Sequence, residues 1–209
     1  MCIFCDEINN PVLARQLMGE TFQYKDRVLF SDECVLAIAG YGPQVFPYVL
    51  VLTKRHVNSF SETTITERKH VLKCLNWLVE RKIFLSSKLC VFEHGGESTT
   101  GNSTIDHFHL HVIDNSLGFF ENINWGDDQI SFEITEENIF DKYRNYLMIG
   151  VYEKNTIHTK INISNIKEPQ YFRKKLALLL KSEQWDWNVG MNNEYVSNLM
   201  DLVFKRSEK

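Results

Sequence analysis

The order of apolar and polar segments predicts an α+β fold, in which an antiparallel sheet packs against one long helix and a C-terminal α/β extension follows. Several short apolar runs have the length of strands, and one longer segment repeats apolar residues at helical spacing. The 209-residue chain is 44% hydrophobic and 24% charged. This composition supplies a sizeable core and is too apolar for a disordered chain. The pattern by itself predicts a generic α+β domain.

The first half of the chain contains the runs that we expect to form the sheet. Residues 27–30 and 34–39 are predicted to pair as a hairpin across the polar turn 31–33. A continuous apolar strand is expected at 48–52, and another at 89–92. A glycine-rich turn then leads into a further strand.

A long helix is predicted between these strands, from about residue 65 to residue 84. Thr64 is followed three residues later by Glu67, which is the signature of a capping box. Apolar side chains then recur at helical spacing, at Val71, Leu72, Leu75, Leu78 and Val79. The helix should therefore cover one face of the sheet.

The second half of the chain is predicted to alternate between helix and strand. The expected elements are a helix at 135–146, a strand at 146–152 and helices at 168–180 and 192–205. No repeat, low-complexity run or flexible linker separates the two halves. We therefore predict a core over residues 1–116 and an extension over residues 117–209 that packs on it.

Charge and cysteine content restrict the class of protein. The net charge is −4, from 23 basic and 27 acidic residues, which argues against broad nucleic-acid binding but leaves local contact with nucleic acid open. Five cysteines, an odd number, do not suggest a secreted disulfide framework. Neither a signal peptide nor a long apolar run is evident, so we expect a cytoplasmic protein without a membrane span.

Three histidines at alternate positions, His107, His109 and His111, are the most informative feature of the chain. Side chains of an extended strand alternate between its two faces, so all three imidazoles should project from one face. Imidazole suits nucleophilic and proton-transfer chemistry near neutral pH, and it is also the commonest metal ligand. The pattern predicts a catalytic or metal-binding strand rather than an ordinary solvated face.

A Cys-x-x-Cys pair, Cys2 and Cys5, stands at the start of the chain. Two thiolates at this spacing can chelate one metal ion, but the pair alone is also compatible with redox chemistry. A redox pair is typically placed between a strand and the N-terminus of a helix, and no strand precedes this one. Zinc would need two further ligands, and reduced, metal-free thiols are the alternative.

The run from Asp106 to Ile113 resembles the signature of the histidine triad (HIT) superfamily, in which three histidines alternate with apolar residues on a strand. The resemblance implies an antiparallel sheet with a packed helix. It also implies a nucleotide substrate, because in this family the middle histidine attacks an α-phosphate and forms a nucleotidyl-histidine intermediate. By that match His109 is the nucleophile, and His111 contacts the phosphate or the leaving group.

The same resemblance implies a structural zinc site. His56 follows an apolar strand and a lysine, as in HIT proteins that begin with Cys-x-x-Cys and complete a zinc site with this histidine and the first histidine of the triad. Carried onto this sequence, the ligands of Zn²⁺ are Cys2, Cys5, His56 and His107.

The glycine-rich turn before the triad supplies candidate phosphate contacts. Ser103 falls where many HIT enzymes carry a Gln or Ser that contacts the phosphate or leaving group. Asn102 and Thr104 flank it, and polar groups of such a turn can approach phosphate oxygens closely. We therefore predict that Ser103 assists catalysis and that Asn102 and Thr104 bind substrate. For Ser103, a hydroxyl that only forms the turn is the alternative.

The chain also departs from the family pattern. Tyr48, a further predicted substrate-binding residue, stands where many members have a fourth histidine, and Thr53 replaces a usual proline. Gly40 falls near the place where many members use an acidic residue to hold the ribose. The nucleotide is therefore not specified.

The resulting hypothesis is a nucleotide hydrolase or nucleotidyl transferase that cleaves a phosphoric anhydride or phosphoramidate bond. The alternative is a non-catalytic nucleotide-binding or RNA-processing-associated scaffold. Only the RNA-processing role rests on the C-terminal sequence, because Gln170, Arg173 and 185–187 weakly resemble the module that follows the triad in CwfJ-like relatives. For Arg173 itself, together with Lys174 and Lys175, the sequence favours a solvated helix face over phosphate contact. HIT proteins often form homodimers, so a homodimer is a candidate assembly.

Overall fold

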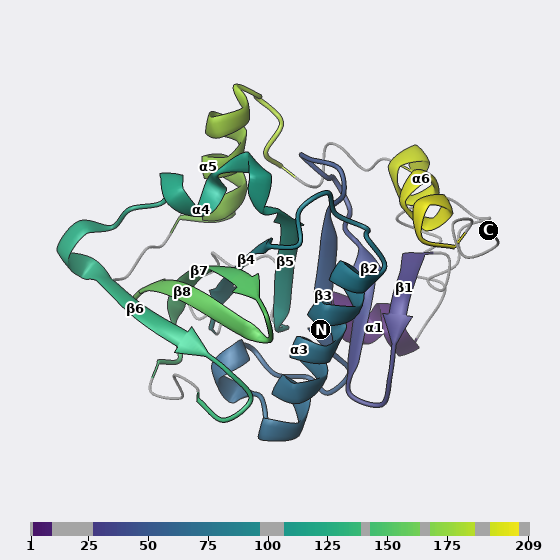
Figure 1. Ribbon diagram of the computed structural model, residues 1–209, viewed down its shortest axis with the longest axis horizontal. Coiled ribbons are helices and arrows are strands. Elements are labelled where there is room, and N and C mark those ends of the chain that lie inside the picture. Colours follow the sequence, from purple (N-terminus) through teal and green to yellow (C-terminus); the bar gives the residue numbers. More distant parts are fainter. Residues whose placement is uncertain are drawn as a thin grey trace.

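The described residues form one antiparallel sheet of eight strands with helices on both of its faces (Figure 1). The computed structural model describes residues 2–9, 27–96, 107–138, 143–163, 168–186 and 193–204. The strand order is β1-β2-β3-β5-β4-β7-β8-β6. The fold is therefore α+β, as predicted.

The strands are β1 (Val28–Ser31), β2 (Val35–Ala39), β3 (Val49–Thr53), β4 (Leu89–Gly95), β5 (His109–Asp114), β6 (Gln129–Ile134), β7 (Tyr146–Glu153) and β8 (Thr156–Asn162). The α-helices are α1 (Ile3–Asn9), α3 (Ile65–Glu80), α4 (Phe119–Asn122), α5 (Tyr171–Leu180) and α6 (Asn193–Phe204). Short 3-10 helices lie at Phe60–Glu62, Asn115–Leu117 and Gly126–Asp128. Among the described helices, none is long and apolar enough to cross a membrane.

The predicted hairpin is confirmed as β1 and β2, and the predicted strands before and after the long helix are confirmed as β3 and β4. The long helix α3 begins as predicted, since the Thr64 side chain accepts from the Glu67 N–H and the Glu67 side chain accepts from the Thr64 N–H. It ends at Glu80, four residues earlier than predicted, because Lys82 adopts a left-handed φ of 52° that does not continue a helix.

The strand β5 lies in the middle of the sheet, between β3 and β4. Leu110 and Val112 are fully buried, whereas His109 and His111 are partly exposed on the other face, as the alternation predicts. His107 lies just before the strand rather than within it. We call the side of the sheet that carries His109 and His111 the histidine face.

The C-terminal half adds strands to the same sheet. β7 pairs with every residue of β4, from Leu89↔Tyr152 to Gly95↔Tyr146, and β8 then pairs with both β7 and β6. The predicted strand at 146–152 and the two later helices are confirmed as β7, α5 and α6. The predicted helix at 135–146 is wrong, because its described residues form a turn and its last residue begins β7.

The two faces of the sheet are covered by different parts of the chain. α3 packs on β2 and β3 and lies in front of the sheet in Figure 1, whereas α1 lies behind it. On the histidine face, Phe119 of α4 and Phe172 of α5 both contact the ring of Phe92 in β4, at centroid distances of 5.5 and 5.2 Å. The second half of the chain therefore contributes side chains to the same face as the triad.

Candidate active site

His109 is held in one orientation by the backbone that precedes it. Its Nδ1 lies 2.7 Å from the carbonyl oxygen of His107. A carbonyl only accepts, so Nδ1 carries the proton, and the neutral ring presents an unprotonated Nε2. Burial lowers the pKa of His109 to about 4, which keeps the imidazole neutral at physiological pH. His109 is therefore prepared as a nucleophile.

His111 lies next to His109, with ring centroids 4.9 Å apart. Its Nδ1 is 2.7 Å from the hydroxyl of Tyr48, and the ring of Phe92 stacks on it at 4.7 Å and an interplanar angle of 8°. Burial, together with the nearby His109 and Arg173, lowers the pKa of His111 well below its usual value. Burial also raises the pKa of Tyr48, so the tyrosine keeps its hydroxyl proton.

Four sulfur and nitrogen donors gather beside the triad. Cys2 Sγ lies 3.3 Å from His107 Nδ1, and Cys5 Sγ lies 3.5 Å from the same nitrogen and 3.4 Å from His56 Nδ1. The four donor atoms lie within 4.8 Å of one another. The structure thus brings together all four residues that the sequence suggested as metal ligands.

The ring of His107 is oriented toward this cluster. Its Nε2 donates to the carbonyl oxygen of Thr53 at 2.8 Å, which leaves the lone pair of Nδ1 directed at the two sulfurs. Metal-binding histidines are commonly oriented in this way by a second hydrogen bond to a carbonyl or carboxylate.

Helix α1 carries the two cysteines and is attached to the sheet by a buried ion pair. The carboxylate of Glu7 binds the guanidinium of Arg27, whose Nε donates to Oε1 at 2.8 Å. The hydroxyl of Tyr41 donates to the same carboxylate at 2.9 Å. Phe4 of the same helix contacts the His109 ring at a centroid distance of 5.3 Å. The N-terminal segment is therefore part of the site.

Two residues of the histidine face were not predicted to belong to the site. His94 of β4 follows Phe92, the partner of His111, by two positions, so strand alternation places it beside His109. Arg173 of α5 is only 6% exposed and reaches Tyr48, so the predicted solvated helix face is wrong for this residue. The sequence could not place His94 beside His109, because that position depends on how β4 pairs with β5 in the sheet.

The predicted phosphate contacts Asn102, Ser103 and Thr104 lie outside the described residues. Tyr48, predicted to bind substrate, is 1% exposed, and its hydroxyl contacts His111.

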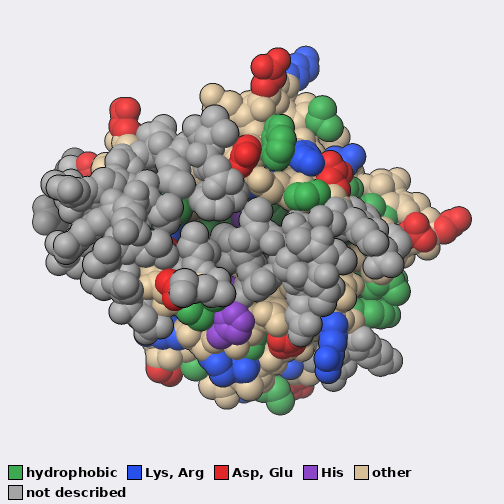
Figure 2. Space-filling view, turned by 180° about the vertical axis from the view of Figure 1, so that it is seen from behind, with side chains coloured by type: hydrophobic (Ala, Val, Ile, Leu, Met, Phe, Trp, Pro, Cys, Tyr) green, Lys and Arg blue, Asp and Glu red, His purple; other side chains and the backbone are tan. Residues whose placement is uncertain are grey.

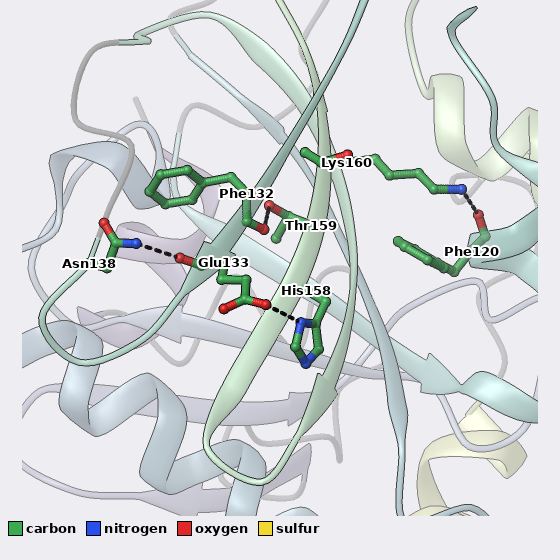
Figure 3. Close-up of a pocket in the computed structure, with 8 residues that line it drawn as sticks. Phe120, Phe132, Glu133, Asn138, His158, Thr159 and Lys160 are labelled. Atoms are coloured by element: carbon green, nitrogen blue, oxygen red, sulfur yellow. Dashed lines mark hydrogen bonds and ion pairs between the residues drawn. The ribbon is translucent and has the colours of Figure 1, made fainter.

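A separate depression of about 510 Å³ lies away from the triad, on β6 and β8 (Figure 3). Its polar groups are already engaged with one another: His158 pairs with Glu133 at 3.1 Å, and Lys160 donates to the carbonyl of Phe120 at 2.9 Å. The histidine site, which holds oriented donors and acceptors, is the better candidate for chemistry. Figure 2 shows the molecule from behind, where acidic and basic side chains are mixed over the described part of the surface and form no broad basic patch.

Proteins similar to this chain are found both among known sequences and among solved structures. The chain is similar to an uncharacterized HIT-like protein of Methanocaldococcus jannaschii, at 27% identity over 129 residues, covering 61% of this chain and 88% of that protein. Among solved structures, it is similar to a hypothetical histidine triad nucleotide-binding protein of Sulfolobus tokodaii (TM-score 0.46, 17% identity, 99% of this chain and 92% of that one). It is also similar to a HIT family hydrolase of Clostridium thermocellum (TM-score 0.38, 18% identity, 60% of this chain and 93% of that one).

The model of the HIT domain matches residues 21–116, a segment that contains the triad, His56 and Tyr48. Residues 21–116 of this chain are therefore similar to a HIT domain, and we call them the HIT-matching segment.

Proposed function

We propose that the protein is a nucleotide hydrolase or nucleotidyl transferase that acts at an α-phosphate through a nucleotidyl intermediate on His109. The observation that carries this proposal is the hydrogen bond from His109 Nδ1 to the His107 carbonyl. It commits one nitrogen and leaves the other with a lone pair, as nucleophilic catalysis by a neutral imidazole requires.

In the first step, His109 Nε2 attacks the α-phosphorus, and the bond between phosphorus and the leaving group breaks. His111 donates a proton to the departing oxygen of an anhydride or the departing nitrogen of a phosphoramidate. In the second step, water or another acceptor attacks the same phosphorus, its proton passes to His111, and His109 is released. Ser103, Asn102 and Thr104 are proposed to contact the phosphoryl oxygens, where donors stabilise the developing charge.

A structural zinc ion is part of the proposal. Tetrahedral zinc with bonds of about 2.3 Å to sulfur and about 2.0 Å to nitrogen separates its sulfur and nitrogen ligands by about 3.5 Å. Three of the four sulfur–nitrogen distances in the cluster are 3.3 to 3.5 Å. Cys2, Cys5, His56 and His107 would hold the ion, which would attach α1 to the sheet beside the catalytic strand.

The test is a substrate screen followed by trapping. Purified protein is assayed against dinucleoside polyphosphates, nucleoside phosphoramidates, nucleotide sugars and capped RNA fragments. With an α-labelled substrate, rapid quench should trap an acid-labile phosphoramidate on His109. His109→Asn should abolish turnover and leave nucleotide binding within a few-fold, and His111→Ala should slow turnover by roughly 10²-fold.

His158→Asn is the matched control, because this exposed histidine lies on β8 at the separate depression. It should turn over like the unmodified protein. Undiminished turnover in His109→Asn would contradict the covalent mechanism. Nucleotide binding without turnover of any substrate in the screen would favour the non-catalytic scaffold instead.

A further inference from the structure

Arg173 is a buried arginine that joins the C-terminal half of the chain to the triad. It lies on α5, and its guanidinium donates to the carbonyl of Trp185 at 2.7 Å, to the carbonyl of Gly42 at 2.6 Å and to the hydroxyl of Tyr48 at 3.5 Å. The backbone at Arg173 is fixed as well, because Gln44 donates to its carbonyl at 2.9 Å. The side chain is therefore held in place from the core and from the extension.

All three acceptors of Arg173 are neutral oxygens. Within the part of the chain that the structure describes, no carboxylate lies within ion-pair distance of its guanidinium. Burying a charge without an opposite charge carries a free-energy cost. A function for the charge and for its directed hydrogen bonds would explain why the fold bears this cost.

The hydrogen bond from Arg173 to Tyr48 bears on the direction of the next hydrogen bond, between Tyr48 and His111. A guanidinium can only donate, so Tyr48 Oη accepts from Arg173. The hydroxyl proton of Tyr48 then remains available for His111 Nδ1, which lies 2.7 Å away. A nitrogen that accepts this proton cannot carry its own. With Tyr48 as the donor in this pair, neutral His111 carries its proton on Nε2.

We infer that Arg173 is a positioning residue that acts through Tyr48 to hold His111 as the tautomer protonated on Nε2. His109 is held as the opposite tautomer, with the proton on Nδ1. Adjacent imidazoles would thus present one lone pair and one N–H. The C-terminal extension supplies the residue that selects the second tautomer.

The catalytic consequence of this inference rests on the proposed function, but the tautomer itself does not. It can be read in the substrate-free, full-length protein by ¹⁵N NMR of labelled histidine, since protonated and unprotonated ring nitrogens have well-separated shifts. The His111 signals are assigned by their loss in His111→Asn. The expected result is a protonated Nε2 and an unprotonated Nδ1 for His111, and the reverse for His109.

Two variants test the chain of hydrogen bonds. Tyr48→Phe removes only the hydroxyl, and Arg173→Met removes the donors while keeping a long side chain. Both should shift His111 toward a mixture of tautomers and leave the His109 signals unchanged, which also reports that the strand is intact. Lys175→Met is the matched control, because Lys175 is an exposed neighbour on α5, and it should change neither histidine.

A protonated Nδ1 on His111 in the unmodified protein would overturn the inference, as would an unchanged His111 tautomer in Arg173→Met. If Arg173→Met does not fold, Arg173→Lys keeps the charge but cannot make all three hydrogen bonds, and the same mixture of tautomers is expected. An unchanged tautomer in that variant would overturn the inference too.

Turnover separates positioning from direct contact with substrate. Arg173→Met should lower kcat by about tenfold or more and leave KM nearly unchanged, because its effect passes through a proton donor. In the His111→Asn background the same substitution should cause no further loss, because residues that act as one unit are not additive. A rise in KM alone would contradict the positioning role of Arg173. A loss of kcat on Arg173→Met that is as large in the His111→Asn background as in the unmodified protein would contradict it too. Absence of any turnover would refute the proposed function and leave the NMR result standing.

Discussion

Glu93 is a carboxyl group buried in the core of the sheet, on the opposite face of β4 from Phe92. Its Oε1 accepts from the Phe60 N–H at 2.9 Å, and its Oε2 accepts from the Tyr146 hydroxyl at 2.6 Å. Burial raises the pKa of Glu93 to about 8, although both hydrogen bonds act in the opposite direction. Because Tyr146 begins β7, this carboxyl joins the HIT-matching segment to the second half of the chain.

The stability of the protein should therefore depend on the charge of Glu93. A group whose pKa is higher in the folded state than in the unfolded state stabilises the fold at low pH, and that contribution is lost as the pH rises through the folded pKa. The free energy of unfolding should fall between about pH 5 and pH 8, by an amount on the order of 1 to 3 kcal/mol.

Glu93→Gln, which cannot ionise, should flatten this part of the curve. Urea unfolding from pH 5 to pH 9 measures the difference, with the exposed Glu183→Gln as control. A Glu93→Gln curve parallel to that of the unmodified protein would contradict a raised pKa.

At the residue scale, local patterns in the sequence predicted some contacts and missed others. Alternation placed His109 and His111 on one face because a strand fixes that relation between near neighbours. The contact of Arg173 with Tyr48 joins residues 125 positions apart, so no local pattern could indicate it. The arginine was predicted to be solvated because charged helix residues usually are, and its partners come from other elements.

At the element scale, the capping box located the start of α3, because its two hydrogen bonds depend on residues only three positions apart. The helix predicted at 135–146 is not formed over the described residues of that range. The Thr135 hydroxyl accepts from the N–H groups of Glu137 and Asn138, at 3.3 and 3.1 Å, as a helix N-cap does, but the described residues that follow close only a turn. The sequence could have indicated β8, because Ile157, Thr159 and Ile161, which are buried, alternate with residues that are exposed or half-exposed.

Helix α1 offers an element-scale prediction about the metal. If zinc links Cys2 and Cys5 to His56 and His107, purified protein should contain about one zinc per chain. Cys5→Ser should lower both the zinc content, measured by elemental analysis, and the melting temperature. A structural site contributes folding free energy, so a chelator should lower the melting temperature of the unmodified protein as well.

Cys34→Ser is the control for this experiment, because Cys34 is a half-buried thiol outside the cluster. It should keep the zinc. Metal-free protein with an unchanged melting temperature would contradict the site and, with it, the assignment of His107 as a structural rather than a catalytic histidine.

At the scale of the whole molecule, the sheet does not end where the HIT-matching segment ends. β4 is bordered by β5 on one side and by β7 on the other, and the β4–β7 pairing joins residues on both sides of position 117. The sequence suggested that the second half packs on the core, but only the pairing shows that it extends the same sheet. The alternation of residues within one strand indicates which of its faces is buried, but it does not indicate which other strand it pairs with.

A chain that ends at residue 116 would lose both this pairing and the cover of the histidine face. β4 would become an edge strand with unpaired N–H and C=O groups, and Phe92 would lose its contacts with Phe119 and Phe172. We expect the fragment 1–116 to aggregate or to remain unfolded, as measured by light scattering and circular dichroism beside the full chain. The fragment would also lack Arg173, so any folded portion should turn over substrate more slowly than the full chain. A soluble fragment with full activity would show instead that residues 117–209 form an independent accessory domain.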